Sequence, residues 1–386
     1  MIEPYLEVAI RQAQERAKLL KTKMPQPSRA TEFVALQQLC ENRIDEIIRL
    51  LDYLLNDTTI LSKELIKERI RIFRRTIGEL SQLETSAITA LNRVHDDDIF
   101  LNKLIFQIHK EINFPLSPPT VTCLSRDYFS INPALHLLEV PLAESEFLLH
   151  LPDLYHEIAH LLIATTNNPK VESLQQALGK LLFEVAKHFD KERMINLRAT
   201  GPTEYFSHVF DLLERFWIPW ATEICCDLFA VFTLGPAYAW SHFHLTAAHG
   251  GDPYDIRLNS FMSHPPDHAR METMLIALDL LNFRSQVTDI KEKWEALVKS
   301  IGAEQTPIYR RACPSQLLQQ AVAYTLDGVK NIGCYVVSET TTGMVHDLLN
   351  NAWQKFWVVP DQYPTWERET INTLKQMANP RTLGQR

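Results

Sequence analysis

Glycine is scarce in this chain, and its scarcity limits the folds that the chain can adopt. The sequence holds 11 glycines in 386 residues, and only Gly78 and Gly179 fall among the first 200. Glycine is the usual residue of tight turns and strand corners, because it adopts backbone angles that other residues avoid. A Rossmann fold, a β-sandwich or a β-barrel is therefore disfavoured. We expect a mainly α protein of the α+β class, with at most a small sheet.

Apolar residues near the N-terminus recur at helical spacing. Over residues 31–56, and again over 62–91, they follow one another at steps of three and four, which is the stripe of an amphipathic helix. A third helix is expected over 97–113. No heptad pattern persists long enough to define a coiled-coil seam. We therefore favour an N-terminal helical bundle over 1–115, with a partner-binding arm as the alternative.

Prolines mark the end of this N-terminal region. The segment NFPLSPPT (113–120) separates it from a central domain over 116–285 and a mostly helical C-terminal region over 286–386. Two segments of the central domain look extended, at 120–126 and 131–141. The patterning there also predicts helices over 151–164, 171–190, 202–216, 219–233 and 266–281.

Charge and cysteine content narrow the choice of partner and compartment. The chain has 39 lysines and arginines and 47 aspartates and glutamates, which gives it a net charge of −8 at pH 7. It has no basic block of the kind that binding to nucleic acid requires. The N-terminus has no signal-peptide pattern, and the longest apolar stretch, 217–240, contains Glu223 and Asp227, which disfavours a transmembrane span. The six cysteines form no CxxC motif, and we interpret Cys225 and Cys226 as packing residues. A soluble, cytoplasmic protein is expected.

The segment LPDLYHEIAHLL carries the clearest chemical signal. His156 and His160 are four residues apart, so on a helix both imidazoles project from one face. Glu157 lies beside them, where a carboxylate can take a proton from a metal-bound water. This HExxH spacing predicts two zinc ligands and a general base. The alternative is a histidine pair on an ordinary packed helix.

A second segment, WATEICCDLFA, offers a third ligand. Glu223 and Asp227 are four residues apart on an apolar helix, where burial of unpartnered acids is costly. A metal for Glu223, and a ligating histidine that donates a hydrogen bond to Asp227, would satisfy both. The alternative is an amphipathic helix whose acids face water.

A third segment, SHPPDHARMETML, places His264 before a helix and Arg270 on it. A histidine at this turn could donate a hydrogen bond to the oxyanion that develops on a substrate carbonyl. We expect Arg270 to be structural, pairing with a carboxylate or a backbone carbonyl.

Together, HEIAH, EICCD and HPPDHAR resemble the gluzincin zinc metallopeptidases, and most closely the group that holds the CAAX prenyl protease and the bacterial heat-shock membrane proteases. That group reads HExxH, ExxxD, then HPxxxxR, and all three elements occur here in this order. The resemblance implies a zincin-like core with zinc held by His156, His160 and Glu223. It also implies that Glu157 is the general base.

The resemblance extends to three further features. It implies that Asp227 orients a ligand, that His264 contacts the substrate, and that the substrate adds as a strand along the edge strand before the catalytic helix, here 136–141. The match covers roughly 120–275. The chain departs from the family in lacking predicted membrane spans, in the extra helices between His160 and Glu223, and in its terminal regions.

We therefore expect a soluble zinc endopeptidase that acts on a protein or peptide substrate. In this hypothesis the N- and C-terminal helical extensions wrap the core and restrict access, and the N-terminal helices bind a regulatory protein partner. The alternative is a non-catalytic helical interaction protein with a structural or vestigial metal site. The choice of zinc depends on the ligand types and on the resemblance to the family, because two histidines and a carboxylate also suit manganese or iron.

Overall fold

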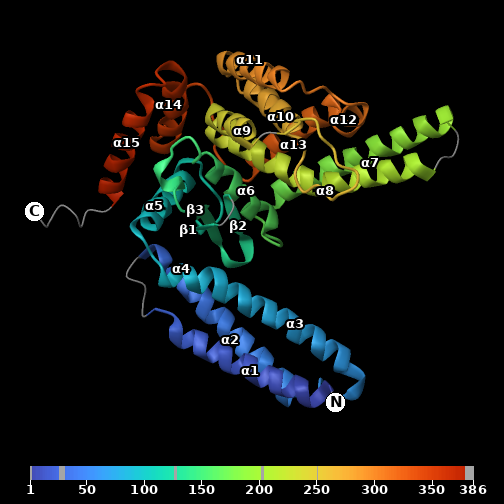
Figure 1. Cartoon of the computed structure of the whole chain (residues 1–386), viewed down its shortest axis with the longest axis vertical. Helices are drawn as coiled ribbons and strands as arrows, with labels where there is room; N and C mark the ends of the chain where they lie inside the picture. Colours follow the sequence, from blue (N-terminus) through green and yellow to red (C-terminus); the bar gives the residue numbers. More distant parts are fainter. Residues whose placement is uncertain (1, 26–30, 126–127, 201–203, 250, 379–386) are drawn as a thin grey trace, which may run out of the picture. The chain divides into compact units, whose positions relative to one another are not determined.

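Helices dominate the chain, and the sheet is small, as the sequence predicted (Figure 1). The computed structural model describes residues 2–25, 31–125, 128–200, 204–249 and 251–378. Its contacts group into two units. Unit 1 holds residues 1–103, 119–142 and 375–386, and unit 2 holds residues 104–118 and 143–374. The division into three consecutive domains stays a prediction.

Unit 1 is built around three long helices, α1 (Ile2–Lys23), α2 (Val34–Asn56) and α3 (Ile66–Gln82). After α3 the chain continues through a π-helical turn (Leu83–Ile88) into α4 (Thr89–Asn92). The apolar stripe predicted over 31–56 lines the core of this bundle. Helix α1 was not predicted, because two alanines interrupt the larger apolar residues of its buried face, Leu6, Ile10, Ala13, Ala17 and Leu20.

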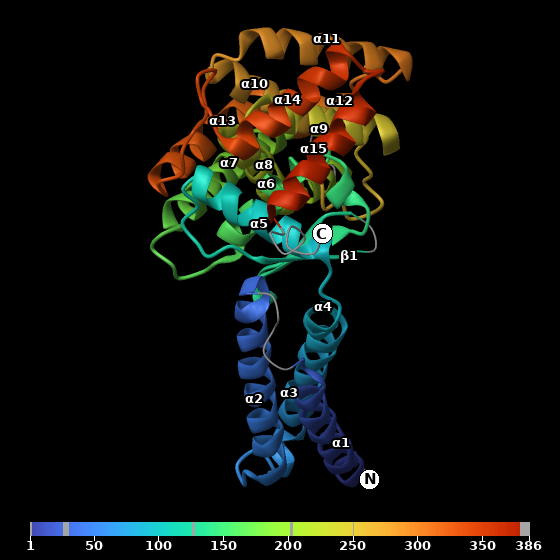
Figure 2. The same ribbon diagram turned by 90° about the vertical axis from the view of Figure 1, so that its left-hand side faces the viewer.

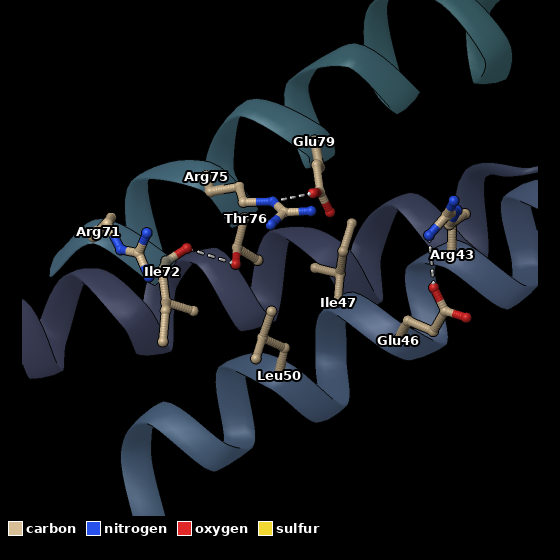
Figure 3. Close-up of a pocket in the computed structure, with 9 residues that line it drawn as sticks. All are labelled: Arg43, Glu46, Ile47, Leu50, Arg71, Ile72, Arg75, Thr76 and Glu79. Carbon is tan, nitrogen blue, oxygen red and sulfur yellow. Dashed lines mark hydrogen bonds and ion pairs between the residues drawn. The ribbon is translucent and has the colours of Figure 1, made fainter. Parts of the chain in front are cut away.

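A groove of about 390 Å³ lies between α2 and α3 (Figure 3). Its lining is apolar at Ile47, Leu50 and Ile72, and arginines stand on either side. Each of these arginines pairs with a glutamate of its own helix, as Arg75 does with Glu79 at 3.0 Å. Such exposed pairs leave little uncompensated charge. The regulatory partner proposed for these helices stays a prediction.

The sheet of unit 1 has the order β1-β3-β2. Strand β3 (Leu137–Pro141) is central, parallel to β1 (Thr120–Ser125) and antiparallel to β2 (Ser130–Asn132). Both sides of the β3 backbone are therefore already paired. The expectation that 136–141 receives a substrate strand is wrong, because strand addition needs an unpaired edge.

The outer edge of β1 is also occupied. Helix α5 (Asp96–Glu111) places Asn102 beside this edge, where its side chain donates to the carbonyl of Val121 at 2.7 Å and accepts from the amide of Val121 at 2.9 Å. Asp98 accepts from the amide of Cys123 at 2.7 Å. Side chains thus satisfy backbone groups that another strand would otherwise pair with.

Unit 2 is helical throughout its described regular structure (Figures 1 and 2). Besides the end of α5 and the part of α15 (Tyr363–Ala378) up to residue 374, its helices are α6 (Asp153–Ala164), α7 (Glu172–Thr200), α8 (Glu204–Leu234), α9 (Pro236–His249), α10 (Asp267–Leu280), α11 (Arg284–Ser300), α12 (Pro307–Ala312), α13 (Ser315–Asn331) and α14 (Met344–Val358). Helix α8 packs against α6, α7, α9, α10 and α13, so it forms the centre of the unit.

Helix α8 corrects one prediction. The two helices expected over 202–216 and 219–233 form a single helix with Pro219 inside it. A proline inside a helix costs about 3 kcal/mol, because it removes a hydrogen bond and crowds the preceding turn. Burial of Trp217 and Trp220 on either side of it offsets that cost. The start predicted at 202 lies outside the described residues.

The segment His208–Leu234 of α8 is long and apolar enough to cross a membrane by length and composition, and 78% of its most apolar window is buried inside the protein. The central helix of a water-soluble protein meets the same criteria. This feature is therefore weak evidence for a membrane span.

Candidate metal centre

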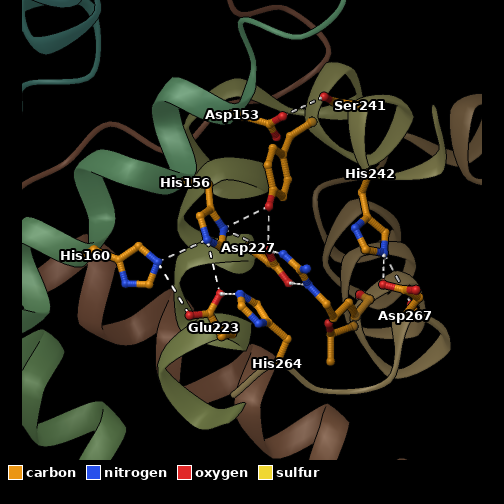
Figure 4. A network of polar contacts seen from close by, with 12 residues as sticks. Asp153, His156, His160, Glu223, Asp227, Ser241, His242, His264 and Asp267 are labelled. Atoms are coloured by element: carbon orange, nitrogen blue, oxygen red, sulfur yellow. Dashed lines mark hydrogen bonds and ion pairs between the residues drawn. The ribbon is translucent and has the colours of Figure 1, made fainter. Parts of the chain in front are cut away.

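Helix α6 presents the two histidines of the HExxH motif on one face (Figure 4). The helix is apolar and almost wholly buried, so its polar side chains need partners inside unit 2. His156 Nε2 lies 3.1 Å from His160 Nε2. Two ring nitrogens at this distance need a proton or a metal ion between them, since their lone pairs repel each other.

Helix α8 brings Glu223 to the same point. Its Oε2 atom lies 3.3 Å from His156 Nε2, and its Oε1 atom lies 3.7 Å from His160 Nε2. Glu223 Oε2 is buried but accepts no hydrogen bond from the described residues. A buried carboxylate oxygen without a donor is costly, so this atom is suited to bind a cation.

The spacing of these atoms fits a tetrahedral ion. Zinc binds nitrogen and oxygen at about 2.0–2.1 Å, so neighbouring ligand atoms of a tetrahedral site are about 3.3 Å apart. The two histidine nitrogens are 3.1 Å apart, and each has a different Glu223 oxygen beside it, Oε2 at 3.3 Å from His156 and Oε1 at 3.7 Å from His160. His156, His160 and Glu223 could therefore hold a zinc ion with small side-chain adjustments.

Asp227, one helical turn after Glu223, contacts the His156 ring at Nδ1, the nitrogen on the far side from Glu223. It is fully buried and accepts two hydrogen bonds from Arg270 of α10, from Nε and Nη2, each at 2.7 Å. It also accepts from the hydroxyl of Tyr238 and lies 2.9 Å from His156 Nδ1. A carboxylate surrounded by donors stays ionised. It therefore holds a proton on His156 Nδ1, and the Nε2 atom is directed toward Glu223.

The two carboxylates of the site stabilise positive charge beside them. Burial disfavours the charged form of His156, but the contacts with Asp227 and Glu223 outweigh burial and raise its pKa to about 10. Burial likewise opposes ionisation of Glu223, yet His156 lowers the pKa of this carboxyl to about 2. Burial and the charge of His156 lower the pKa of His160 to about 4. A metal ion would supply the charge that the His156 proton otherwise provides.

Glu157 lies beside the ligands without a structural partner. Glu157 is buried, with 9% of the residue exposed, and none of the described residues donates a hydrogen bond to it. Burial raises the pKa of its carboxyl to about 7. A carboxyl with such a pKa can both accept and donate a proton near neutral pH.

His264 lies at the solvent side of the site. Its Nε2 atom is 3.7 Å from Glu223 Oε2, its Nδ1 atom contacts the hydroxyl of Ser263 at 2.9 Å, and its side chain is 62% exposed. The structure thus brings all the residues singled out in the sequence to one site, and Arg270 pairs with a carboxylate as expected.

Sequence reasoning missed two residues of this site. Tyr238 of α9 contacts both Asp227 and His156 Nδ1, and only tertiary structure brings α9 to this place. Cys226, interpreted as a packing residue, offers a sulfur atom that lies within 4.8 Å of the ligand nitrogens of His156 and His160. Its position three residues after Glu223 was the available signal, because that spacing shares a helix face.

Glu223 is the better third ligand of the two. Its carboxylate is ionised and faces both histidines at 3.3 and 3.7 Å. Burial, by contrast, raises the pKa of the Cys226 thiol well above its ordinary value, which keeps it neutral and a poor ligand until a metal is bound. Cys226 is thus a candidate for a further ligand.

Comparison of the chain with protein-family models, with curated proteins and with solved structures gives no match.

Proposed function

We propose that this protein is a zinc-dependent endopeptidase with a zincin-like core, in which His156, His160 and Glu223 bind the metal. The observation that carries the proposal is a pair of histidine nitrogens 3.1 Å apart, each with an oxygen of Glu223 within 3.7 Å, next to the Glu157 carboxyl, to which no described residue donates a hydrogen bond. The order of the three motifs, which resembles the gluzincin metallopeptidases, also supports it.

Zinc held by these side chains would act as a Lewis acid on a substrate carbonyl and make a water molecule more acidic. Glu157 then accepts a proton from the attacking water at its carboxylate. As the carbon–nitrogen bond breaks, Glu157 donates the same proton to the leaving amine. The water is thereby divided between the new carboxyl group and the new amine.

His264 and Asp227 have supporting roles in this mechanism. His264 is exposed at the edge of the site, where its Nε2–H can donate to the carbonyl oxygen as negative charge develops on it. Asp227, held by Arg270, keeps the proton of His156 on Nδ1 and so leaves Nε2 free to bind. The substrate class is a protein or peptide chain.

Cys226 supports a second candidate, a structural metal centre without catalysis. Structural zinc sites hold four protein ligands, whereas catalytic sites keep one position open. If Cys226 joined His156, His160 and Glu223, the site would be closed to substrate. Its sulfur lies within 4.8 Å of the ring nitrogens of both histidines.

Metal content tests the site itself. We expect about one zinc per chain by elemental mass spectrometry, lost in His160→Ala and retained in His95→Ala, a matched change at an exposed histidine outside the site. Zinc should remain in Glu157→Gln, while cleavage of an unfolded substrate should be lost. Cleavage by Glu157→Gln at the wild-type rate would refute the mechanism.

Cobalt replacement separates the two candidates. A sulfur ligand adds a thiolate-to-cobalt charge-transfer band in the near ultraviolet, and nitrogen and oxygen ligands do not. We expect the band to be absent and Cys226→Ser to leave the cobalt spectrum unchanged. A strong band that Cys226→Ser removes would favour the closed, structural centre.

A further inference from the structure

The face of α8 that carries Glu223 and Asp227 continues toward the start of the helix through Trp220 and Phe216. These four residues follow one another at steps of four, three and four, so they share one side of the helix. A segment that packs along this face of α8 therefore ends at the candidate metal centre.

The segment before α10 lies along this face. The ring of Phe261 contacts the ring of Phe216 edge-on, with centroids 6.1 Å apart. One residue later, the carbonyl of Met262 accepts a hydrogen bond from Trp220 Nε1 at 3.1 Å. Two successive residues are thus held on successive turns of α8.

The same segment ends at the metal centre. Two residues after Met262, the side chain of His264 reaches Glu223, with 3.7 Å between its Nε2 atom and Oε2. Residues 261–264 therefore run beside α8 in the direction of that helix and connect an aromatic ring to the proposed catalytic position. We call residues 261–264 the strap.

Phe261 is the large apolar side chain of the strap that is exposed to solvent, at 72%, although the backbone of the next residue, Met262, is hydrogen-bonded to α8. Phe216 of α8, which contacts Phe261, is buried, so one ring of the pair lies in the core and the other lies on the surface. An aromatic ring held in water at a fixed place is suited to contact another apolar group.

The distance from Phe261 to the site can be expressed in substrate residues. Phe216 and Glu223 are seven residues apart on α8, which corresponds to about 10 Å along a helix. An extended chain advances about 3.3 Å per residue. An extended substrate lying beside the strap would therefore place its third residue from the cleaved bond next to Phe261.

We propose that Phe261 is a substrate contact, and that the preferred substrates are extended peptide segments with a large apolar side chain about three residues from the cleaved bond. The position of that bond rests on the proposed function. Such segments are exposed in unfolded proteins and buried in folded ones. The strap thus favours unfolded chains over native surfaces.

The test uses full-length protein with the Glu157→Gln change, so that peptides bind without being cleaved. The probes are fluorescent serine-rich peptides that carry one phenylalanine, moved one position at a time, and a matched peptide without it. Their affinities are measured by anisotropy for Glu157→Gln alone and with Phe261→Ser. Phe183→Ser is the control, since Phe183 of α7 is 62% exposed and contacts Lys187 instead of the site.

We expect the phenylalanine peptides to bind about two- to tenfold more tightly than the matched peptide, which is the range of one aromatic contact. Phe261→Ser should abolish this preference, and Phe183→Ser should keep it. Cleavage of the same peptides by wild-type protein should occur about three residues from the phenylalanine. Equal affinities in the parent protein, or a preference that survives Phe261→Ser, would overturn the proposal.

Failure of the proposed function has a different signature. If the phenylalanine preference depends on Phe261 but zinc-loaded wild-type protein cleaves none of the peptides, the strap binds apolar chains and the endopeptidase proposal is wrong. If wild-type protein cleaves the peptides and Phe261→Ser cleaves them with the same preference, the endopeptidase stands and the contact is wrong.

Discussion

The buried pair of Asp227 and Arg270 can be tested without any metal. Two hydrogen bonds of 2.7 Å join them, Asp227 is fully buried, and the Arg270 side chain is 11% exposed. Asp227→Asn removes the negative charge and leaves a buried guanidinium without a counter-charge. Breaking a buried ion pair in this way costs about 3–5 kcal/mol, because the remaining charge keeps its desolvation penalty.

A double-mutant cycle isolates the interaction. Arg270→Met should also destabilise, since it removes the cation that pairs with the carboxylate, whereas the double variant leaves neither member of the pair charged. We therefore expect the double variant to be less destabilised than the sum of the single variants, by about 1–3 kcal/mol. A matched control is Asp255→Asn, because Asp255 and Arg257 form a 2.7 Å pair on the surface. Its cost should be about 0–1 kcal/mol.

The measurement is urea unfolding in the presence of a chelator, followed by tryptophan fluorescence. All seven tryptophans lie between residues 217 and 366, so the signal reports unit 2, which holds the pair. Additive effects of the two single changes, or a cost for Asp227→Asn no larger than for Asp255→Asn, would show that the pair does not interact as described.

Three further outcomes follow from individual contacts. Tyr238→Phe removes a hydrogen-bond donor to Asp227, the carboxylate that orients His156, so zinc affinity in a chelator competition should fall about 10–100-fold. Unchanged affinity would contradict this. Gly328→Ala should lower the free energy of unfolding by about 1–3 kcal/mol, because its Cβ would lie 3.1 Å from the backbone of Leu174, whereas Gly179→Ala meets nothing within 4 Å and should raise it by about 1 kcal/mol. Burial lowers the pKa of His268 to about 4, so the folded protein keeps this side chain neutral. The free energy of unfolding should therefore be highest above about pH 6.5 and fall by about 3 kcal/mol as the pH drops to 4, because the unfolded chain binds the proton first. Urea unfolding of His268→Phe at the same pH values should lack this loss.

The sequence alone determined the features that depend on local helical spacing. His156 and His160 share a face of α6 because a helix repeats every 3.6 residues, and the same geometry places Glu223 and Asp227 on one face of α8. The cost of burying acids on an apolar helix then predicted that these carboxylates have partners. Helices α2 and α3 of unit 1 could be predicted for the same reason, because apolar residues mark one face of each.

Tertiary structure decided what depends on contacts between distant segments. The central position of β3 follows from pairing with strands on both sides, and a strand's own residues do not specify its neighbours. Helix α8 continues through Pro219 because packing outweighs the local cost. Tyr238 joins the site from α9, and Phe261 reaches the α8 face through a segment without regular structure. Periodicity records which side of an element is buried, whereas the identity of the partner is set by how the elements pack in space.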